Sequence, residues 1–108
     1  MSDKKPMTLS NLKELLASNS NGFKLIDIRS AEEYNKLHIP AAENTPAEEL
    51  QNKLSSFSKD DTIVCVCNKG HERSQNAAAF LFSNGFENSF YLEGGTVGWF
   101  DTPAPFPK

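Results

Sequence analysis

One continuous stretch carries most of the information about the fold: Thr62-Ile63-Val64-Cys65-Val66-Cys67-Asn68-Lys69-Gly70-His71-Glu72-Arg73. Its first part, 62–67, is apolar and rich in β-branched side chains, which predicts a central strand. A polar loop follows the strand. The segment 75–82 then contains a run of alanines and ends before Asn84-Gly85, which predicts a helix that lies close to the sheet. Strand, loop and helix in this order are typical of an α/β fold.

The segments before this stretch repeat the pattern. Leucines at helical spacing in 9–16 predict a first helix, with Ser10 or Asn11 as its N-cap. The apolar run 23–28 is predicted to be a buried parallel strand. Two capping boxes, 30–33 and 45–48, predict the starts of a short helix and of a longer helix that continues through Leu54, with Pro46 at its first position.

The segment 90–92 is predicted to be a last short strand, closed by Gly94-Gly95. Strands that alternate with helices indicate a parallel sheet. We therefore predict an α/β, three-layer fold with a central, mostly parallel sheet flanked by helices. Residues 1–7 are expected to form a loose N-terminal arm, 8–101 one domain, and 102–108 a Pro-rich C-terminal tail.

Length and composition limit the functions that the chain can have. Its 108 residues, 38% hydrophobic and 23% charged, suit one compact domain. The formal net charge of -3, with no basic stripe, argues against a nucleic-acid partner. No apolar run is long enough to cross a membrane, and none follows the charged N-terminus as in a secretory signal. We therefore expect a cytoplasmic protein with no membrane partner.

The two cysteines, Cys65 and Cys67, are too few for a disulfide framework. Two residues apart in a strand, they are expected to point to opposite walls or to be badly placed for a bridge. No second Cys/His pair at metal spacing accompanies them, so we predict neither a metal site nor a cofactor. Cys65, inside the apolar run, is predicted to be a small buried hydrophobic residue.

Cys67 lies at the predicted strand end, where ligands bind in open α/β sheets. The loop behind it leads into a helix N-terminus, whose free N–H groups and dipole favour anions. Gly70 allows the loop to curl around an anion, and Lys69, His71 and Arg73 add positive charge. These features favour a thiolate at Cys67, which can attack sulfur or phosphorus. The alternative is an ordinary buried cysteine at a strand end.

Four segments resemble, in order, the rhodanese-like domain family. They are Leu25–Arg29 followed by Glu33-Tyr34, His38–Ala42, the Cys67 loop with its Cys-x-x-Gly start, and Leu92–Gly95 followed by Trp99. Each motif alone is weak, but four in register are a specific signal. The resemblance covers about residues 8–101 and implies a rhodanese-like fold and a sulfurtransferase.

The resemblance also implies roles for individual residues. Cys67 would take a sulfane sulfur from a small anionic donor such as thiosulfate, or from a persulfide donor. The Cys67 persulfide would pass it to cyanide or to a thiol acceptor, which could be a protein. Substrate binding would fall to the active-site loop: Asn68, Lys69, Gly70, His71, Glu72, Arg73 and Ser74.

Other matched residues are expected to be structural. Asp27 and Arg29 would form hydrogen bonds near the loop, His38 would fix a turn, and Trp99 would serve in packing. Glu32 and Glu33 are most simply helix-start charges.

The loop departs from the sulfurtransferase pattern in its length. From Cys67 to Arg73 it is one residue longer than usual, and Cys, five residues, Arg is the pattern of cysteine-dependent phosphatases and of related arsenate reductases. Glu72 also fits that pattern, whereas Gly70, Val66 and the Gly94-Gly95…Trp99 ending favour sulfur transfer. A phosphatase or arsenate reductase on the same fold is therefore one alternative. A non-catalytic anion-binding or regulatory module is another.

Overall fold

The computed structural model describes residues 5–18, 22–69 and 72–101. Within these ranges a five-stranded sheet has the order β1-β5-β4-β2-β3, and all four pairs of neighbouring strands run parallel. The strands are β1 (Pro6–Met7), β2 (Phe23–Asp27), β3 (Glu43–Asn44), β4 (Thr62–Val66) and β5 (Ser89–Leu92). The strand predicted from 62–67 is β4, and it lies in the middle of the sheet.

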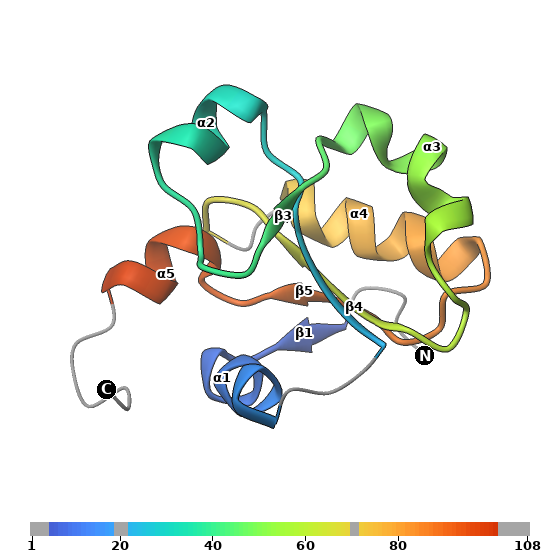
Figure 1. Ribbon diagram of the computed structural model, residues 1–108, viewed down its shortest axis with the longest axis horizontal. Helices are drawn as coiled ribbons and strands as arrows, with labels where there is room; N and C mark the ends of the chain where they lie inside the picture. The colour runs from blue at the N-terminus through green and yellow to red at the C-terminus, as the bar shows by residue number, and fades with distance from the viewer. Residues whose placement is uncertain (1–4, 19–21, 70–71, 102–108) are drawn as a thin grey trace.

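Helices cover both faces of this sheet. They are α1 (Leu9–Ser18), α2 (Ala31–Lys36), α3 (Leu50–Lys53), α4 (Glu72–Ser83) and α5 (Gly95–Asp101), with 3-10 turns η1 (Ala47–Glu49) and η2 (Leu54–Ser56) on either side of α3. Figure 1 shows α3 and α4 on one face of the sheet and α1 on the other. The predicted three-layer α/β fold is confirmed.

The core consists of two clusters, one on each face of the sheet. Along β4, Ile63 and Cys65 belong to the cluster beneath α3 and α4, whereas Val64 and Val66 belong to the cluster that contains Leu12 of α1. All four strand residues are fully buried. Because both faces are covered, the strand is apolar throughout and does not alternate with polar residues.

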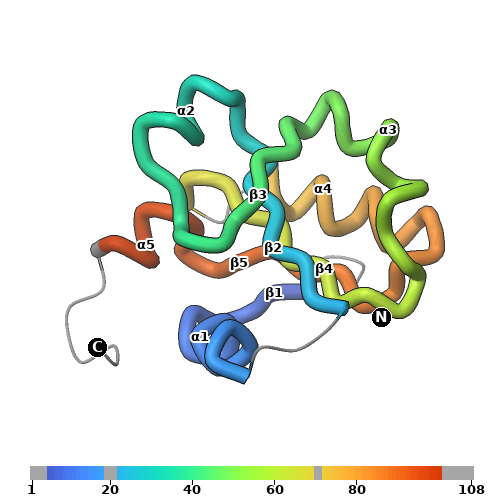
Figure 2. The backbone as a smooth tube through the Cα atoms, viewed as in Figure 1, coloured from blue at the N-terminus to red at the C-terminus, as the bar shows by residue number. Residues whose placement is uncertain are grey.

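The carboxyl ends of the parallel strands share one edge of the sheet. Figures 1 and 2 show that α2, the segment after β4 and α5 all gather at this edge. The backbone joins neighbouring strand ends there, since Ile28 N donates to Val66 O at 2.9 Å. This edge is where a ligand site is expected in an open parallel sheet.

Of the three predicted helix caps, two are wrong and one is confirmed. Helix α1 is capped by Thr8, whose Oγ1 accepts from Asn11 N at 3.1 Å, and not by Ser10 or Asn11. Thr45 caps no helix because it extends the sheet: its N–H donates to Asp27 O at 2.8 Å and its side chain is buried. The expected long helix is therefore the irregular run η1-α3-η2. The capping box of Ser30 and Glu33 is present at the start of α2.

The two ends of the domain also differ from expectation. Pro6–Met7, the end of the expected loose arm, pairs with Tyr91 and Leu92 of β5. Helix α5 was not predicted, because Gly95 is its first residue and Gly94 precedes it, and glycine disfavours a helix. The proposed tail, 102–108, lies outside the described residues. In the described ranges, no helix combines the length and the hydropathy that a membrane span needs.

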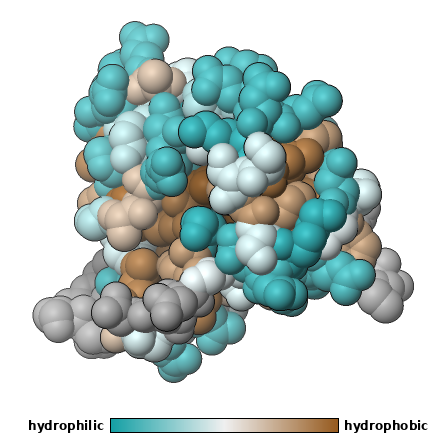
Figure 3. All heavy atoms as spheres, turned by 45° about the vertical axis from the view of Figure 1, so that its right-hand side comes forward, coloured by the Kyte–Doolittle hydropathy of each residue, from teal (hydrophilic) through white to brown (hydrophobic). Residues whose placement is uncertain are grey.

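Hydrophobic side chains also reach the surface in places. On the face shown in Figure 3 they lie between hydrophilic margins. The large apolar side chains that are exposed are Leu37, Phe80, Val97 and Phe100. Single exposed apolar residues are common in soluble domains, so most of these need no special role.

Candidate active site

Cys67 follows β4 directly and is almost completely buried. Its Sγ lies 3.1 Å from Oγ of Ser74, to which the thiol donates a hydrogen bond. Ser74 lies in the first turn of α4 and is itself fully buried. Helix α4 begins at Glu72 and not at 75, so Glu72, Arg73 and Ser74 of the predicted loop belong to the helix.

Cys65 lies on the same face of the sheet as Cys67, because alternate residues of a strand share a face. The expectation of opposite walls is therefore wrong. Neither cysteine forms a disulfide bond. Burial raises the pKa of the Cys65 thiol far above its usual range, with a smaller contribution from Cys67. Cys65 thus behaves as the buried hydrophobic residue that the sequence predicted.

Helix α5 holds the start of the loop in place. Thr96 N donates to Cys67 O at 2.9 Å, and Val97 N donates to Asn68 O at 2.8 Å. This approach needs glycine at position 95, where a Cβ atom would lie 2.4 Å from Cys67 O and 2.6 Å from Asn68 O. The backbone of Thr96 and Val97 is a part of the site that the sequence analysis missed. The signal was the Gly94-Gly95 pair, which was interpreted as a strand end and as part of a family motif, but not as a contact with the loop.

Asp27 and Arg29 form a buried ion pair beside the loop. Arg29 Nη2 and Nε donate to Asp27 Oδ2 and Oδ1 at 2.7 and 2.9 Å, and both residues are almost completely buried. The hydrogen bond with Asp27 raises the pKa of Arg29, against the opposing effect of burial. Arg29 Nη1 also donates to Asn68 Oδ1 at 2.9 Å, so the pair reaches the loop directly.

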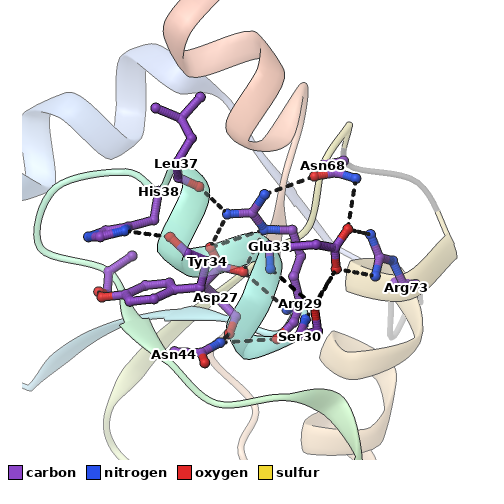
Figure 4. Close-up of polar contacts among 11 residues, drawn as sticks. Asp27, Arg29, Ser30, Glu33, Tyr34, Leu37, His38, Asn44, Asn68 and Arg73 are labelled. Atoms are coloured by element: carbon purple, nitrogen blue, oxygen red, sulfur yellow. Dashed lines mark hydrogen bonds and ion pairs between the residues drawn. The ribbon is translucent and has the colours of Figure 1, made fainter.

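A second ion pair joins α2 to α4. Arg73 Nη1 and Nη2 donate to Glu33 Oε1 and Oε2 at 3.2 and 3.4 Å, and Asn68 Nδ2 donates to Glu33 Oε2 at 3.3 Å. Figure 4 shows the Glu33 carboxylate between Asn68 and Arg73. The bond from Arg73, followed by the bond from Ser30 N, lowers the pKa of Glu33 to about 2. Glu33 is thus more than a helix-start charge, and nothing in its own segment indicated a partner in α4.

The described part of the loop surrounds a shallow hollow. Cys67, Asn68, Lys69, Glu72 and Arg73 line it, and Lys69, Glu72 and Arg73 are exposed. Gly70 and His71, which the sequence analysis also assigned to the loop, lie outside the described residues. A second hollow, between η1-α3 and α4, shares Arg73 with the first. The nucleophile candidate is therefore recessed at an open hollow that is lined by polar and charged groups.

The remaining matched residues have packing contacts. His38 Nδ1 lies 2.8 Å from Tyr34 O, and its ring stacks on Tyr34 at a centroid distance of 3.8 Å. Trp99 packs against the core cluster on the α1 face, with Lys13 Nζ 4.3 Å from its ring centroid. Among the described residues, no group of three or more His, Cys, Asp or Glu side chains could hold a metal ion.

Chemically, the site combines a buried thiol with a hollow that is open to solvent. A helix begins next to the thiol, so its free N–H groups and dipole favour negative charge there. A hydroxyl contacts the sulfur and can donate to a thiolate. This arrangement suits nucleophilic attack by a cysteine followed by release of an anion.

Comparison with known proteins agrees with this chemistry. The rhodanese-like domain family matches residues 8–102. The thiosulfate sulfurtransferase GlpE of Shewanella oneidensis is 32% identical over 104 residues, which cover 96% of this chain and 100% of that protein. The thiosulfate sulfurtransferase GlpE of Pseudomonas fluorescens is 31% identical over 86 residues, which cover 80% of this chain and 78% of that protein.

Solved structures show the same relationship. A rhodanese-like domain protein from Staphylococcus aureus superimposes with a TM-score of 0.77 at 32% identity and covers 88% of this chain and 90% of its own. The human single-domain sulfurtransferase TSTD1 gives a TM-score of 0.81 at 26% identity, over 96% of this chain and 100% of its own. The chain therefore belongs to the rhodanese-like domain family, and it is an enzyme of the sulfurtransferase type.

Proposed function

We propose that the chain moves a sulfane sulfur from thiosulfate or a persulfide donor to a thiol or cyanide acceptor, through a persulfide on Cys67. The observation that carries the proposal is the place of Cys67. It directly follows β4, contacts the hydroxyl of Ser74, is bonded to α5 through its carbonyl, and lines an open hollow. The names of the GlpE relatives support thiosulfate as one donor.

The reaction has two displacements at sulfur. In the first, the Cys67 thiolate attacks the sulfane sulfur of thiosulfate, an S–S bond forms, and sulfite leaves with the electron pair of the S–S bond that breaks. In the second, the acceptor thiolate or cyanide attacks the outer sulfur of the persulfide, and the Cys67 thiolate leaves. No net charge is lost in either step, and the enzyme returns to its starting state.

The described residues can help in both steps. The Ser74 hydroxyl and the start of α4 lie where negative charge on the sulfur of Cys67 or its persulfide would need stabilisation. The Asn68 amide and Lys69 line the same hollow and can bind the anionic end of a donor. We also assign Glu72, Arg73 and the Gly70-His71 segment to donor binding, as part of the proposal.

The acceptor can be a small thiol or a protein. Val97 is exposed, and its N–H bonds to the loop at Asn68. Leu37 is exposed too, and its carbonyl accepts from Arg29, which in turn bonds Asn68. Val97 thus contacts the loop directly and Leu37 is linked to it through Arg29, so these two exposed apolar residues could contact a protein that brings its thiol to the loop. This supports a protein acceptor without naming one.

Mass spectrometry tests the proposal directly. After treatment with thiosulfate, the chain should gain the mass of one sulfur atom on Cys67, and cyanide should remove it as thiocyanate. The Cys67→Ser protein should show neither the gain nor any transfer, whereas Cys65→Ala should keep both, because Cys65 is buried away from the hollow. Full transfer by Cys67→Ser would overturn the proposal. Aryl-phosphate hydrolysis or arsenate reduction that depends on Cys67, without sulfur transfer, would favour the phosphatase or arsenate reductase alternative.

A further inference from the structure

The contact between Arg73 and Glu33 bears on the unusual length of the loop. Arginine six positions after the cysteine could clasp a tetrahedral oxyanion with its fork of N–H groups. In this structure both terminal nitrogens of that fork bond to the Glu33 carboxylate, at 3.2 and 3.4 Å. Glu33 is itself held by Asn68 Nδ2 and by its capping bonds with Ser30. The arginine is thus directed toward α2.

The same contact neutralises the positive charge of Arg73 at the hollow beside Cys67. Among the described residues there, Lys69 and Arg73 are positive and Glu72 and Glu33 are negative, so their charges sum to zero. The neighbouring Arg29 is already paired with Asp27 at 2.7 Å. Because the pKa of Glu33 is lowered to about 2, its charge is present throughout the neutral range. The charges of these side chains therefore contribute little to the binding of a small dianion.

We propose that Glu33 is a specificity-determining residue: by pairing with Arg73 it weakens the site for small tetrahedral dianions and favours sulfur donors of lower charge, such as organic persulfides. Thiosulfate is a dianion of the disfavoured kind, and phosphate and arsenate are mostly dianions at a pH somewhat above neutral. The part of this proposal that concerns sulfur donors rests on the proposed function. The part that concerns dianion binding does not.

The chain offers a matched control for the test. Glu33→Gln removes the charge but keeps a side chain that can complete the capping box of α2. Glu32→Gln removes one negative charge from the same helix turn, at an exposed position whose side chain does not line the hollow. The difference between the two variants therefore isolates the contact with Arg73 from the general loss of negative charge.

Binding of inorganic phosphate provides the readout that does not depend on sulfur transfer. Phosphate that occupies the loop should protect Cys67 from alkylation by iodoacetamide, which mass spectrometry measures. The fully buried Cys65 is the internal negative control for alkylation. We expect the phosphate concentration for half protection to be about threefold to fivefold lower in Glu33→Gln than in Glu32→Gln, as for the loss of one exposed ion pair. In the double variant Glu33→Gln/Arg73→Gln this gain should disappear.

Kinetics with two donors test the second part. The ratio of kcat/KM for thiosulfate to that for cysteine persulfide should rise in Glu33→Gln by about the same factor, relative to Glu32→Gln. The proposal is overturned if Glu33→Gln binds phosphate no more tightly than Glu32→Gln, or if the gain persists without Arg73. If the unaltered chain forms no Cys67 persulfide, the proposed function fails, and the phosphate experiment still decides the role of Glu33.

Discussion

At the scale of single residues, two cysteines on one face of one sheet lie in different environments although only one residue separates them. Cys65 lies within β4, is fully buried, and has a pKa raised by desolvation, so it stays a neutral thiol. Cys67 lies beyond the strand end, contacts a hydroxyl and lines a hollow. Reactivity of cysteine depends on such surroundings, and here two positions along the chain are enough to change them.

Glu33 gives a prediction for the pH dependence of stability. Its pKa is lowered from an ordinary value of 4.5 to about 2, chiefly by the hydrogen bond from Arg73. A carboxylate with a lowered pKa in the folded state contributes stability above its unfolded pKa, and this contribution is lost as the pH falls toward the folded pKa. The free energy of unfolding should therefore differ between the unaltered chain and Glu33→Gln by a constant amount from pH 7 to pH 5, as estimated from this linkage.

The difference should shrink as the pH falls from about 4.5 toward about 2. Urea unfolding at a series of pH values measures it. Glu32→Gln, at an exposed neighbouring position, should show a much smaller change over the same range. A difference for Glu33→Gln that stays constant down to the acid limit would contradict the assigned ion pair.

At the scale of elements, the contact between α5 and the loop after β4 holds the loop from outside the sheet. In the first turn of α5, the N–H groups of Thr96 and Val97 donate hydrogen bonds to the carbonyls of Cys67 and Asn68. Gly95 has a φ of +56°, and a Cβ atom there would meet the backbone of both loop residues. A rigid backbone cannot move aside as a flexible side chain can, so this glycine fixes how closely α5 and the loop approach.

We therefore predict opposite outcomes for two glycines of α5. Gly95→Ala should destabilise the fold by about 3 kcal/mol or more, from the left-handed backbone and the clash together, and should abolish sulfur transfer. Gly98→Ala places its Cβ atom 3.5 Å from Leu9 Cδ1, an ordinary contact, and should be neutral or stabilising by up to about 1 kcal/mol. Thermal unfolding and the transfer assay measure both. Equal stability of the two variants would refute the role of Gly95.

The elements also show what the sequence could and could not predict. Strand β4 was predictable because its apolar run is long and buried on both faces. The cap of α2 was predictable because both of its partners lie in one short segment. Thr45 has the same local pattern, but its backbone bonds to Asp27 in the sheet, and that tertiary contact overrides the cap. Pairing of Glu33 with Arg73 joins residues forty positions apart and leaves no local signal.

At the scale of the whole molecule, Arg29 connects three parts of the domain. Its guanidinium bonds to Asp27 at the end of β2, to the Leu37 carbonyl after α2, and to Asn68 in the loop after β4. The group is almost completely buried, so the sheet, α2 and the loop meet around one charge that water does not solvate. Removal of one partner would leave the other charge buried and unpaired, which is more costly than loss of the pair.

This asymmetry gives a prediction for global stability. Arg29→Met, of similar length but neutral, should lower the free energy of unfolding by about 3–5 kcal/mol, because Asp27 is left buried without its counter-ion. Asp27→Asn in the same chain should restore at least about 1 kcal/mol, since no buried charge then remains. Lys24→Met removes a longer and only partly exposed ion pair, in which Lys24 Nζ lies 3.9 Å from Asp61 Oδ2, and it should cost less than about 1 kcal/mol because Asp61 Oδ2 still accepts from Ser58 N. Urea unfolding measures all three, and a cost for Arg29→Met no larger than that for Lys24→Met would mean that the buried pair does not hold the domain together.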